Sequence, residues 1–226
     1  MGKSGKFLRI TAIILMGITS AHILLGASGS VCISWFPEQY ESLVNVVPYK
    51  GIYQIATSFT FVAAFIGIWS VVGLVRGKSK AYTLAVSALI LSIVTALTKM
   101  YYSNMLRGST MPTDIRLYLS IFTLLYFLML RLPGIKDKVD LTKSGKNDSS
   151  GTGAGTGMAM VLAGIAFLTT HLWAGPSHMM DGRNLVLVLD APLTYGGIAL
   201  LVGGVVFLLR IAFAKANAPQ KITEST

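Results

Sequence analysis

Residues 51–75, GIYQIATSFTFVAAFIGIWSVVGLV, contain no charged side chain, and Lys50 and Arg76 bound the stretch on either side. A helix needs about 20 predominantly apolar residues to cross the hydrocarbon core of a bilayer. Five further apolar stretches follow the same pattern, although the fourth span is short. The six predicted spans are residues 7–27, 51–75, 81–102, 117–131, 158–175 and 194–214. The sequence therefore predicts an all-α, polytopic membrane protein with six transmembrane helices.

The positive charges lie mostly on one side of these predicted spans. If the N-terminus is cytoplasmic, 14 of the 19 lysines and arginines are inside, and the others are Lys50, Lys99, Arg107, Arg116 and Arg183. Cytoplasmic loops of membrane proteins carry such an excess of Lys and Arg. We therefore predict an integral, multi-pass membrane protein with its N- and C-termini in the cytoplasm. Because topology and anionic lipid headgroups account for the net charge of +10, we expect a lipid bilayer as partner and no nucleic acid.

A polar, glycine-rich segment divides the predicted spans into two groups. We expect a four-helix transmembrane unit at 1–133, a flexible cytoplasmic linker at 134–157, a two-helix transmembrane hairpin at 158–214 and a cytoplasmic tail at 215–226. Alternating glycines in the linker resemble a phosphate-binding loop, but the P-loop lysine and hydroxyl residue are missing. A flexible tether is the simpler interpretation.

The first predicted span has an alternative interpretation as a cleaved signal peptide within residues 1–29. A basic start, an apolar stretch and the small residues Ala27-Ser28-Gly29 fit that pattern. The apolar stretch is longer than usual and contains His22, which favours a transmembrane helix. The single cysteine, Cys32, excludes an internal disulfide.

The loop after the first span contains a helical pattern. Pro37 can begin a helix, and Tyr40, Leu43, Val44 and Val47 follow the spacing of one apolar face. We predict a short interfacial helix near 37–47 on the outer surface.

The last predicted span carries glycine pairs that repeat at seven residues, Gly196/Gly197 and Gly203/Gly204. Small residues on one face allow helices in lipid to approach closely. We expect this face to dock on the four-helix unit or on another membrane subunit.

Ionisable and aromatic residues gather at one depth of the predicted bilayer. His22, Lys99 and His171 each lie near the end of a helix that runs outward, with Tyr101 and Tyr102 beside them. Ionisable groups within a membrane are costly and therefore mark candidate functional sites. We predict a ligand pocket for a quinone, lipid or small substrate in the outer leaflet, lined by these five residues.

Several alternatives compete with this pocket. His22 and His171 are candidate axial ligands of a b-type haem, although only three histidines exist in the chain. A copper site would use soft ligands from His171, His178, Met179, Met180 and Cys32. The simplest alternative is that the polar side chains only anchor the helices at the interface. The metal candidates are thus His22, His171 and His178, with none assigned.

The segment 107–116 offers a further interpretation, in which Arg107 and Arg116 bind an anionic headgroup, although an ordinary connecting loop explains it more simply. No hydrolase motif occurs in the chain. The leading functional prediction is a small integral membrane protein that acts as a subunit or accessory of a larger membrane complex. The alternatives are a redox subunit that binds quinone or haem b through His22 and His171, and a small carrier.

Overall fold

The computed structural model describes residues 3–110, 112–139, 141, 149–180 and 182–216. Within these residues the long helices are α1 Lys3–Gly29, α3 Lys50–Arg76, α4 Ala81–Arg107, α5 Thr113–Met129, α6 Ser149–Leu168 and α8 Asp190–Ala216. Short helical segments join them: α2 Val31–Trp35, η1 Pro37–Gln39, η2 Glu41–Tyr49, α7 Thr170–Trp173, η3 Gly175–His178 and η4 Leu185–Leu189. Two-residue strands, β1 Met179–Met180 and β2 Arg183–Asn184, pair antiparallel.

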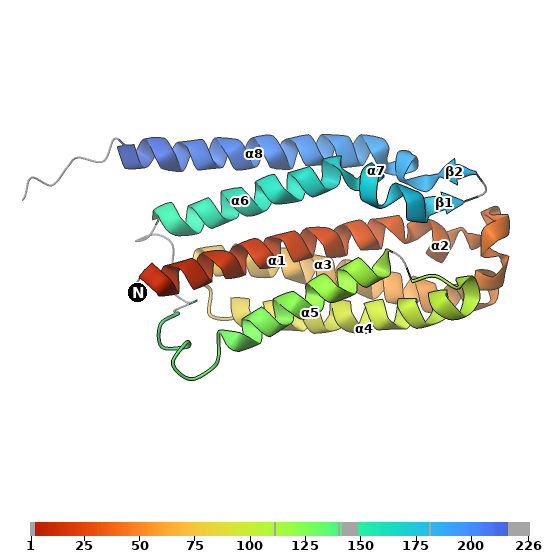
Figure 1. Cartoon of the computed structure of the whole chain (residues 1–226), viewed down its shortest axis with the longest axis horizontal. Coiled ribbons are helices and arrows are strands. Elements are labelled where there is room, and N and C mark those ends of the chain that lie inside the picture. The colour runs from red at the N-terminus through yellow and green to blue at the C-terminus, as the bar shows by residue number, and fades with distance from the viewer. Residues whose placement is uncertain (1–2, 111, 140, 142–148, 181, 217–226) are drawn as a thin grey trace, which may run out of the picture.

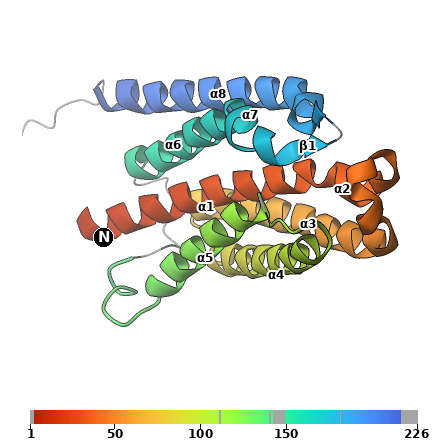
Figure 2. The same ribbon diagram turned by 45° about the vertical axis from the view of Figure 1, so that its right-hand side comes forward.

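The long helices lie side by side along the long axis of the molecule (Figure 1). Helix α1 is central and contacts α3, α5 and α6, while α4 packs against α3 and α5. Helix α8 packs on α6, so that these two helices form a layer on the far side of α1 from α4 and α5 (Figure 2). We call the end that holds Gly29, Lys50, Arg107 and Asp190 the outer end, after the predicted orientation, and the opposite end the inner end.

Within the described residues, four helices are long and apolar enough to cross a membrane: Ser4–Gly29, Glu41–Arg76, Ala81–Arg107 and Val186–Ala214. The chain is helical, as predicted, and these helices are compatible with an integral membrane protein. The fourth and fifth predicted spans correspond to shorter helices. Helix α5 has 17 residues, which is about 25 Å of helix, and the apolar part of α6 is Gly153–Leu168.

Large apolar side chains point outward from the bundle, whereas small ones fill the spaces between helices. On α3, Phe65 and Trp69 are 62% and 71% exposed, while Ala63, Ala64 and Gly67 are buried. Hydroxyl pairs join helices inside the bundle, including Thr19–Thr123 at 2.7 Å between Oγ1 atoms. Small residues and polar cross-links between helices, with apolar side chains outside, are typical of bundles in lipid.

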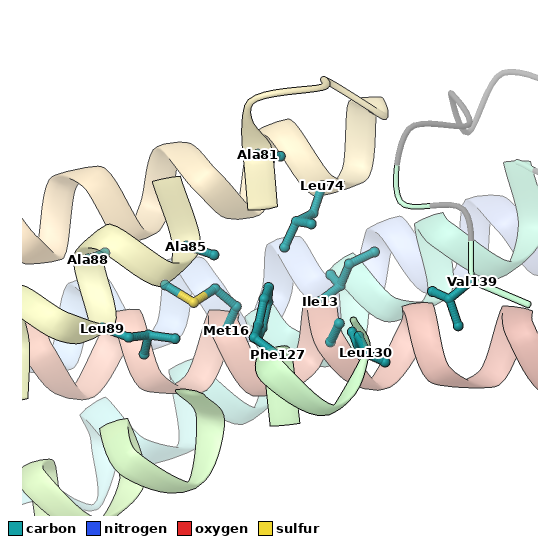
Figure 3. Packing of buried hydrophobic residues seen from close by; sticks show 11 residues of the cluster. Ile13, Met16, Leu74, Ala81, Ala85, Ala88, Leu89, Phe127, Leu130 and Val139 are labelled. Atoms are coloured by element: carbon teal, nitrogen blue, oxygen red, sulfur yellow. The ribbon is translucent and has the colours of Figure 1, made fainter. Parts of the chain in front are cut away.

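The inner end is closed by an apolar core. Met16 of α1, Leu74 of α3, Leu89 of α4 and Phe127 of α5 are fully buried in one cluster. Figure 3 shows these side chains between the helices, together with Ile13 and the alanines of α4. Apolar packing fills this part of the bundle, and the polar pockets described below lie toward its other end.

Residues 149–157, the last part of the predicted linker, form the first turns of α6. Glycines of this segment lie where α6 contacts α1 and α8. A Cβ added to Gly155 would lie 3.3 Å from Ile10 Cγ2 of α1, and one added to Gly157 would lie 2.6 Å from Leu208 Cγ of α8. The glycines therefore allow α6 to fit between two helices. Residues 140, 142–148 and 217–226, which belong to the predicted linker and tail, lie outside the described residues.

The segment predicted as an interfacial α-helix near 37–47 is helical but has 3₁₀ geometry. In η2, Leu43 and Val46 are fully buried, whereas Val44, which we predicted on the apolar face, is 65% exposed. A 3₁₀ helix repeats every three residues, so the buried positions are spaced by three rather than by three and four. The segment packs over Ile33 and Tyr53 at the outer end.

Candidate functional site

Small polar pockets open at the outer end, where α1 and α4 end and α5 begins. One has a volume of about 40 Å³ and is lined by Ser30, Tyr53, Lys99, Ser103 and Arg107 among others. A second, of about 60 Å³, lies against Gly26, Thr113 and Arg116. Both share Gly29, Ser30, Pro112, Thr113 and His178 as walls. A space of about 10–15 Å³ already holds one water, so each pocket has room for a small polar group.

Lys99 reaches the first pocket from α4, about two turns before the helix ends. Its side chain is only 4% exposed. Its Nζ atom has no hydrogen-bond partner among the described residues. The side chain therefore does not reach solvent in the way that a lysine at a membrane interface usually does.

Arg116 reaches the second pocket from the first turn of α5 and is also 4% exposed. Its Nη1 donates a hydrogen bond to Thr60 Oγ1 at 3.2 Å, while Nε and Nη2 have no partner among the described residues. Gly26 of α1 makes room for this side chain, since an added Cβ there would lie 3.3 Å from Arg116 Cδ. The guanidinium is thus held in one position with two donors unused.

The two buried cations lack a counter-charge in the described part of the chain. No acidic side chain described there pairs with Lys99 or Arg116. The positive charge of Arg116 instead repels that of Lys99. Taking a charged group out of water costs several kcal/mol unless an opposite charge and hydrogen bonds compensate. Two neighbouring pockets, each with one such cation in its wall, are suited to hold an anion.

Neutral polar groups complete the walls of these pockets. Tyr53 Oη and Ser103 Oγ are hydrogen-bonded at 3.1 Å, and the Ser30 hydroxyl donates to the Gly26 carbonyl at 2.6 Å. These contacts fix the hydroxyls in place. The walls therefore present oriented dipoles around the cations.

His178 borders both polar pockets. Its Nδ1 lies 2.8 Å from the Ala174 carbonyl oxygen, to which it donates, and its Nε2 lies close to Gly29. Burial lowers the pKa of His178, the hydrogen bond to Ala174 partly opposes this, and the positive charge of Arg107 lowers the pKa further. The imidazole is therefore neutral at pH 7, and its lone pair is on Nε2.

An apolar cavity of about 490 Å³ adjoins these polar pockets. Leu25, Val31, Phe61, Val186 and Leu193 are among its walls, which come from α1, α2, α3, η4 and α8. Gly29 and His178 line this cavity as well as both polar pockets. The outer end thus combines a cationic region with a much larger apolar one.

Of the predicted pocket residues, the structure places only Lys99 in these pockets. The His22 ring stacks on Trp173, with centroids 5.6 Å apart, and its Nδ1 lies 3.2 Å from the Ile18 carbonyl oxygen. His171 is exposed on α7. The structure does not bring these two histidines together at a shared pocket, so it offers no support for a haem between them.

Tyr101 is 67% exposed, and Tyr102 packs on Tyr49 with ring centroids 5.6 Å apart. Both tyrosines therefore lie outside the polar pockets. For copper, the described residues contain no group of three His, Cys, Asp or Glu side chains that could hold a metal ion. Cys32 lines the apolar cavity, and the side chains of Met180, Asp181 and Arg183 lie outside the described part of the structure.

Arg116 is the main residue missing from the predicted pocket. The interpretation of Arg107 and Arg116 as headgroup ligands was nearer to the geometry, because both line the polar pockets.

No protein family matches this chain, and no curated protein or solved structure shows significant similarity to it.

Proposed function

We propose that this protein is a small integral membrane protein that binds an anionic ligand in the polar pockets of its outer end. One observation carries the proposal: Lys99 and Arg116 are buried, and Lys99 Nζ and Arg116 Nε and Nη2 have no hydrogen-bond partner among the described residues. Unsatisfied buried cations destabilise a fold, so their presence is best explained by a ligand that completes the site.

The unused atoms of Arg116 favour a carboxylate or phosphate over a simple halide. Nε and Nη2 lie on the same edge of the guanidinium, and this edge can donate two parallel hydrogen bonds to two oxygens of one anion. Lys99 would add a third charged donor. An anion with at least two oxygens uses all of these groups.

In this proposal all six long helices cross the bilayer, with both chain termini in the cytoplasm. The excess of lysines and arginines on one side of the helices supports this orientation. In this orientation the cationic pockets lie in the outer leaflet. The short α5 spans if the bilayer adapts at its ends, at a modest cost.

Assembly into a larger complex, the leading prediction from sequence, has weaker support. The four glycines of α8 lie against α6 of the same hairpin, where Gly197 faces Leu168 and Gly204 faces Gly157 and Val161. Their face is therefore covered within the chain. The pockets, rather than the glycine face, carry the functional proposal.

A ligand-dependent change in thermal stability tests the proposal. Purified protein in neutral detergent is heated with increasing methyl phosphate, with methyl sulfate as a second anion and choline as a cation. We expect both anions to raise the unfolding temperature and choline to have no effect, because a ligand stabilises only the state that binds it.

Variants connect this effect to the site. Arg116→Gln and Lys99→Met should remove the response to methyl phosphate, whereas Arg131→Gln and Lys80→Met, at exposed positions of the inner end, should keep it. An identical response in all four variants would show that the anion binds elsewhere, and the proposal would be wrong.

A further inference from the structure

The cationic pockets and the large apolar cavity share walls, and this arrangement specifies the ligand more closely. Gly29 and His178 line all three spaces, so the polar pockets and the apolar cavity adjoin at these two residues. A Cβ at position 29 would lie 3.1 Å from His178 Nε2. The imidazole therefore packs directly against the backbone at position 29, and any side chain there would meet the ring.

The cavity has the size and lining of a binding site for an apolar group. Its volume of about 490 Å³ lies within the range of about 300–1,000 Å³ that is usual for small-molecule sites. Leu25, Val31, Phe61, Val186 and Leu193 offer no charged group to a ligand. A hydrophilic anion would use the polar pockets and leave this cavity to apolar contents.

We infer that the ligand is an anionic amphiphile, with its phosphate or carboxylate head at Lys99 and Arg116 and its apolar chain in the cavity beyond Gly29. The inference rests on the proposed function, since the head group is the anion that these cations bind. Complementary charge in the small pockets and apolar walls in the adjoining large one match the two halves of such a molecule.

Two phosphate monoesters with the same head separate the inference from the proposed function. Methyl phosphate reports on the head pocket alone, and dodecyl phosphate reports on head and chain together. Each is titrated into wild-type protein in phosphatidylcholine nanodiscs, and the unfolding temperature gives the affinity. We expect dodecyl phosphate to bind at least tenfold more tightly than methyl phosphate.

Partition into the lipid also concentrates dodecyl phosphate, so cavity-filling variants are needed. Leu193→Trp places an indole in the cavity from α8, and Ile198→Trp, on the same helix but absent from the cavity lining, is its matched control. We expect Leu193→Trp to weaken dodecyl phosphate at least tenfold and leave methyl phosphate unchanged. Ile198→Trp should change neither affinity. Val31→Phe fills the cavity from α2, so a folding defect in one variant does not decide the test.

The outcomes separate the proposed anion site from the inference that the ligand has an apolar chain. If Arg116→Gln leaves methyl phosphate binding intact, the proposed function is wrong. If Arg116→Gln abolishes methyl phosphate binding but Leu193→Trp and Val31→Phe leave dodecyl phosphate affinity unchanged, only the inference of an apolar chain is overturned.

The source of the amphiphile follows from a competition experiment. Nanodiscs that contain phosphatidic acid are compared with pure phosphatidylcholine nanodiscs in the dodecyl phosphate titration. Competition by phosphatidic acid would identify the ligand as a phospholipid of the bilayer. A lack of competition would identify it as a single-chain amphiphile. Equal binding of dodecyl phosphate to wild-type protein and Arg116→Gln in both discs would overturn the inference.

Discussion

Lys99 is buried on a helix that would be more stable with an apolar side chain at this position. Its Nζ atom has no hydrogen-bond partner among the described residues, and the positive charge of Arg116 repels the lysine charge. Taking an ion out of water costs several kcal/mol, and no counter-charge in the described part of the chain compensates this cost for Lys99. A residue that lowers stability in this way is typical of a functional site.

We therefore expect Lys99→Met to raise the unfolding temperature in anion-free buffer and to abolish the rise caused by methyl phosphate. Thermal unfolding in detergent, with and without the anion, measures both effects. Lys80→Met, which removes an exposed lysine, should change neither. A lower unfolding temperature for Lys99→Met, with the anion response preserved, would mean that Lys99 is compensated within the protein.

Arg116 offers a test of geometry rather than charge. Arg116→Lys keeps the positive charge but removes the edge formed by Nε and Nη2. Because a hydrogen bond to a charged group contributes about 1.5–3 kcal/mol, we expect methyl phosphate to bind at least about tenfold more weakly. Equal affinity of Arg116→Lys and wild-type protein would show that the guanidinium edge does not hold the anion.

His178 should make stability depend on pH. Its pKa is lowered in the folded protein, chiefly by burial, from the ordinary value of about 6.5. The unfolded chain therefore takes up a proton at this site at a higher pH than the folded chain does. Stability should fall as the pH is lowered through about 6.5, since protons then favour the unfolded state.

The measurement is the unfolding temperature of anion-free protein between about pH 7.5 and pH 5. His178→Gln should reduce the loss on acidification, whereas His171→Gln, at an exposed position, should leave it unchanged. The same slope in wild-type protein and His178→Gln would show that this imidazole does not contribute.

At the scale of elements, apolar periodicity predicted most helices but not the geometry of every one. Long, predominantly apolar stretches located α1, α3, α4 and α8, because a membrane helix needs length and apolarity above all. The glycine-rich start of α6 has low intrinsic helix propensity. It is helical because α1 and α8 pack closely against it, and sequence composition does not reveal such contacts.

The packing of α6 on α8 leads to a prediction with an internal control. A Cβ at Gly164 would lie 2.7 Å from Leu201 N and 2.8 Å from the Gly197 carbonyl oxygen, both of which are backbone atoms. Backbone cannot move aside as a flexible side chain can. We expect Gly164→Leu to force the two helices apart and to cost about 1–3 kcal/mol.

Gly196→Leu is the matched control, since its added Cβ would meet only Phe167 ring atoms, the nearest at 3.6 Å. Gly203→Leu should be intermediate, because its nearest neighbour is the flexible end of Met160. Unfolding temperature and the monodisperse fraction after purification measure the order. Equal losses in all three variants would contradict the close packing of these helices.

At the scale of the whole molecule, α1 lies at the centre and contributes walls to every pocket described at the outer end. A cleaved signal peptide at 1–29 would remove Gly26 and Gly29 from the site.

The sequence predicted polar residues toward one end of the helices, but it did not predict which of them line the pockets there. Lys99 and His22 were placed near the same depth, yet Lys99 faces the pockets while His22 stacks on Trp173. Distance along a helix determines depth, whereas the direction of a side chain depends on how each helix is rotated in the bundle. Arg116 was missed for the same reason, because only the tilt and packing of α5 turn its side chain inward against Gly26.

The orientation of the whole molecule determines which compartment supplies the ligand. The cationic pockets open beside Arg107 and Thr113, at the same end as the turn after Gly108. In a Cys32→Ser background, Ser109→Cys should react with a membrane-impermeant thiol reagent in intact cells. Asp137→Cys, on the opposite side, should react only after permeabilisation, because positively charged loops remain in the cytoplasm.

Labelling of Asp137→Cys but not Ser109→Cys in intact cells would show that the protein has the opposite orientation. The pockets would then open toward the cytoplasm, and the anion would be a cytoplasmic one or a lipid of the inner leaflet. Lys99 and Arg116 would still require a counter-charge, since burial and not compartment makes them costly. The topology experiment therefore tests where the ligand comes from, independently of whether an anion binds.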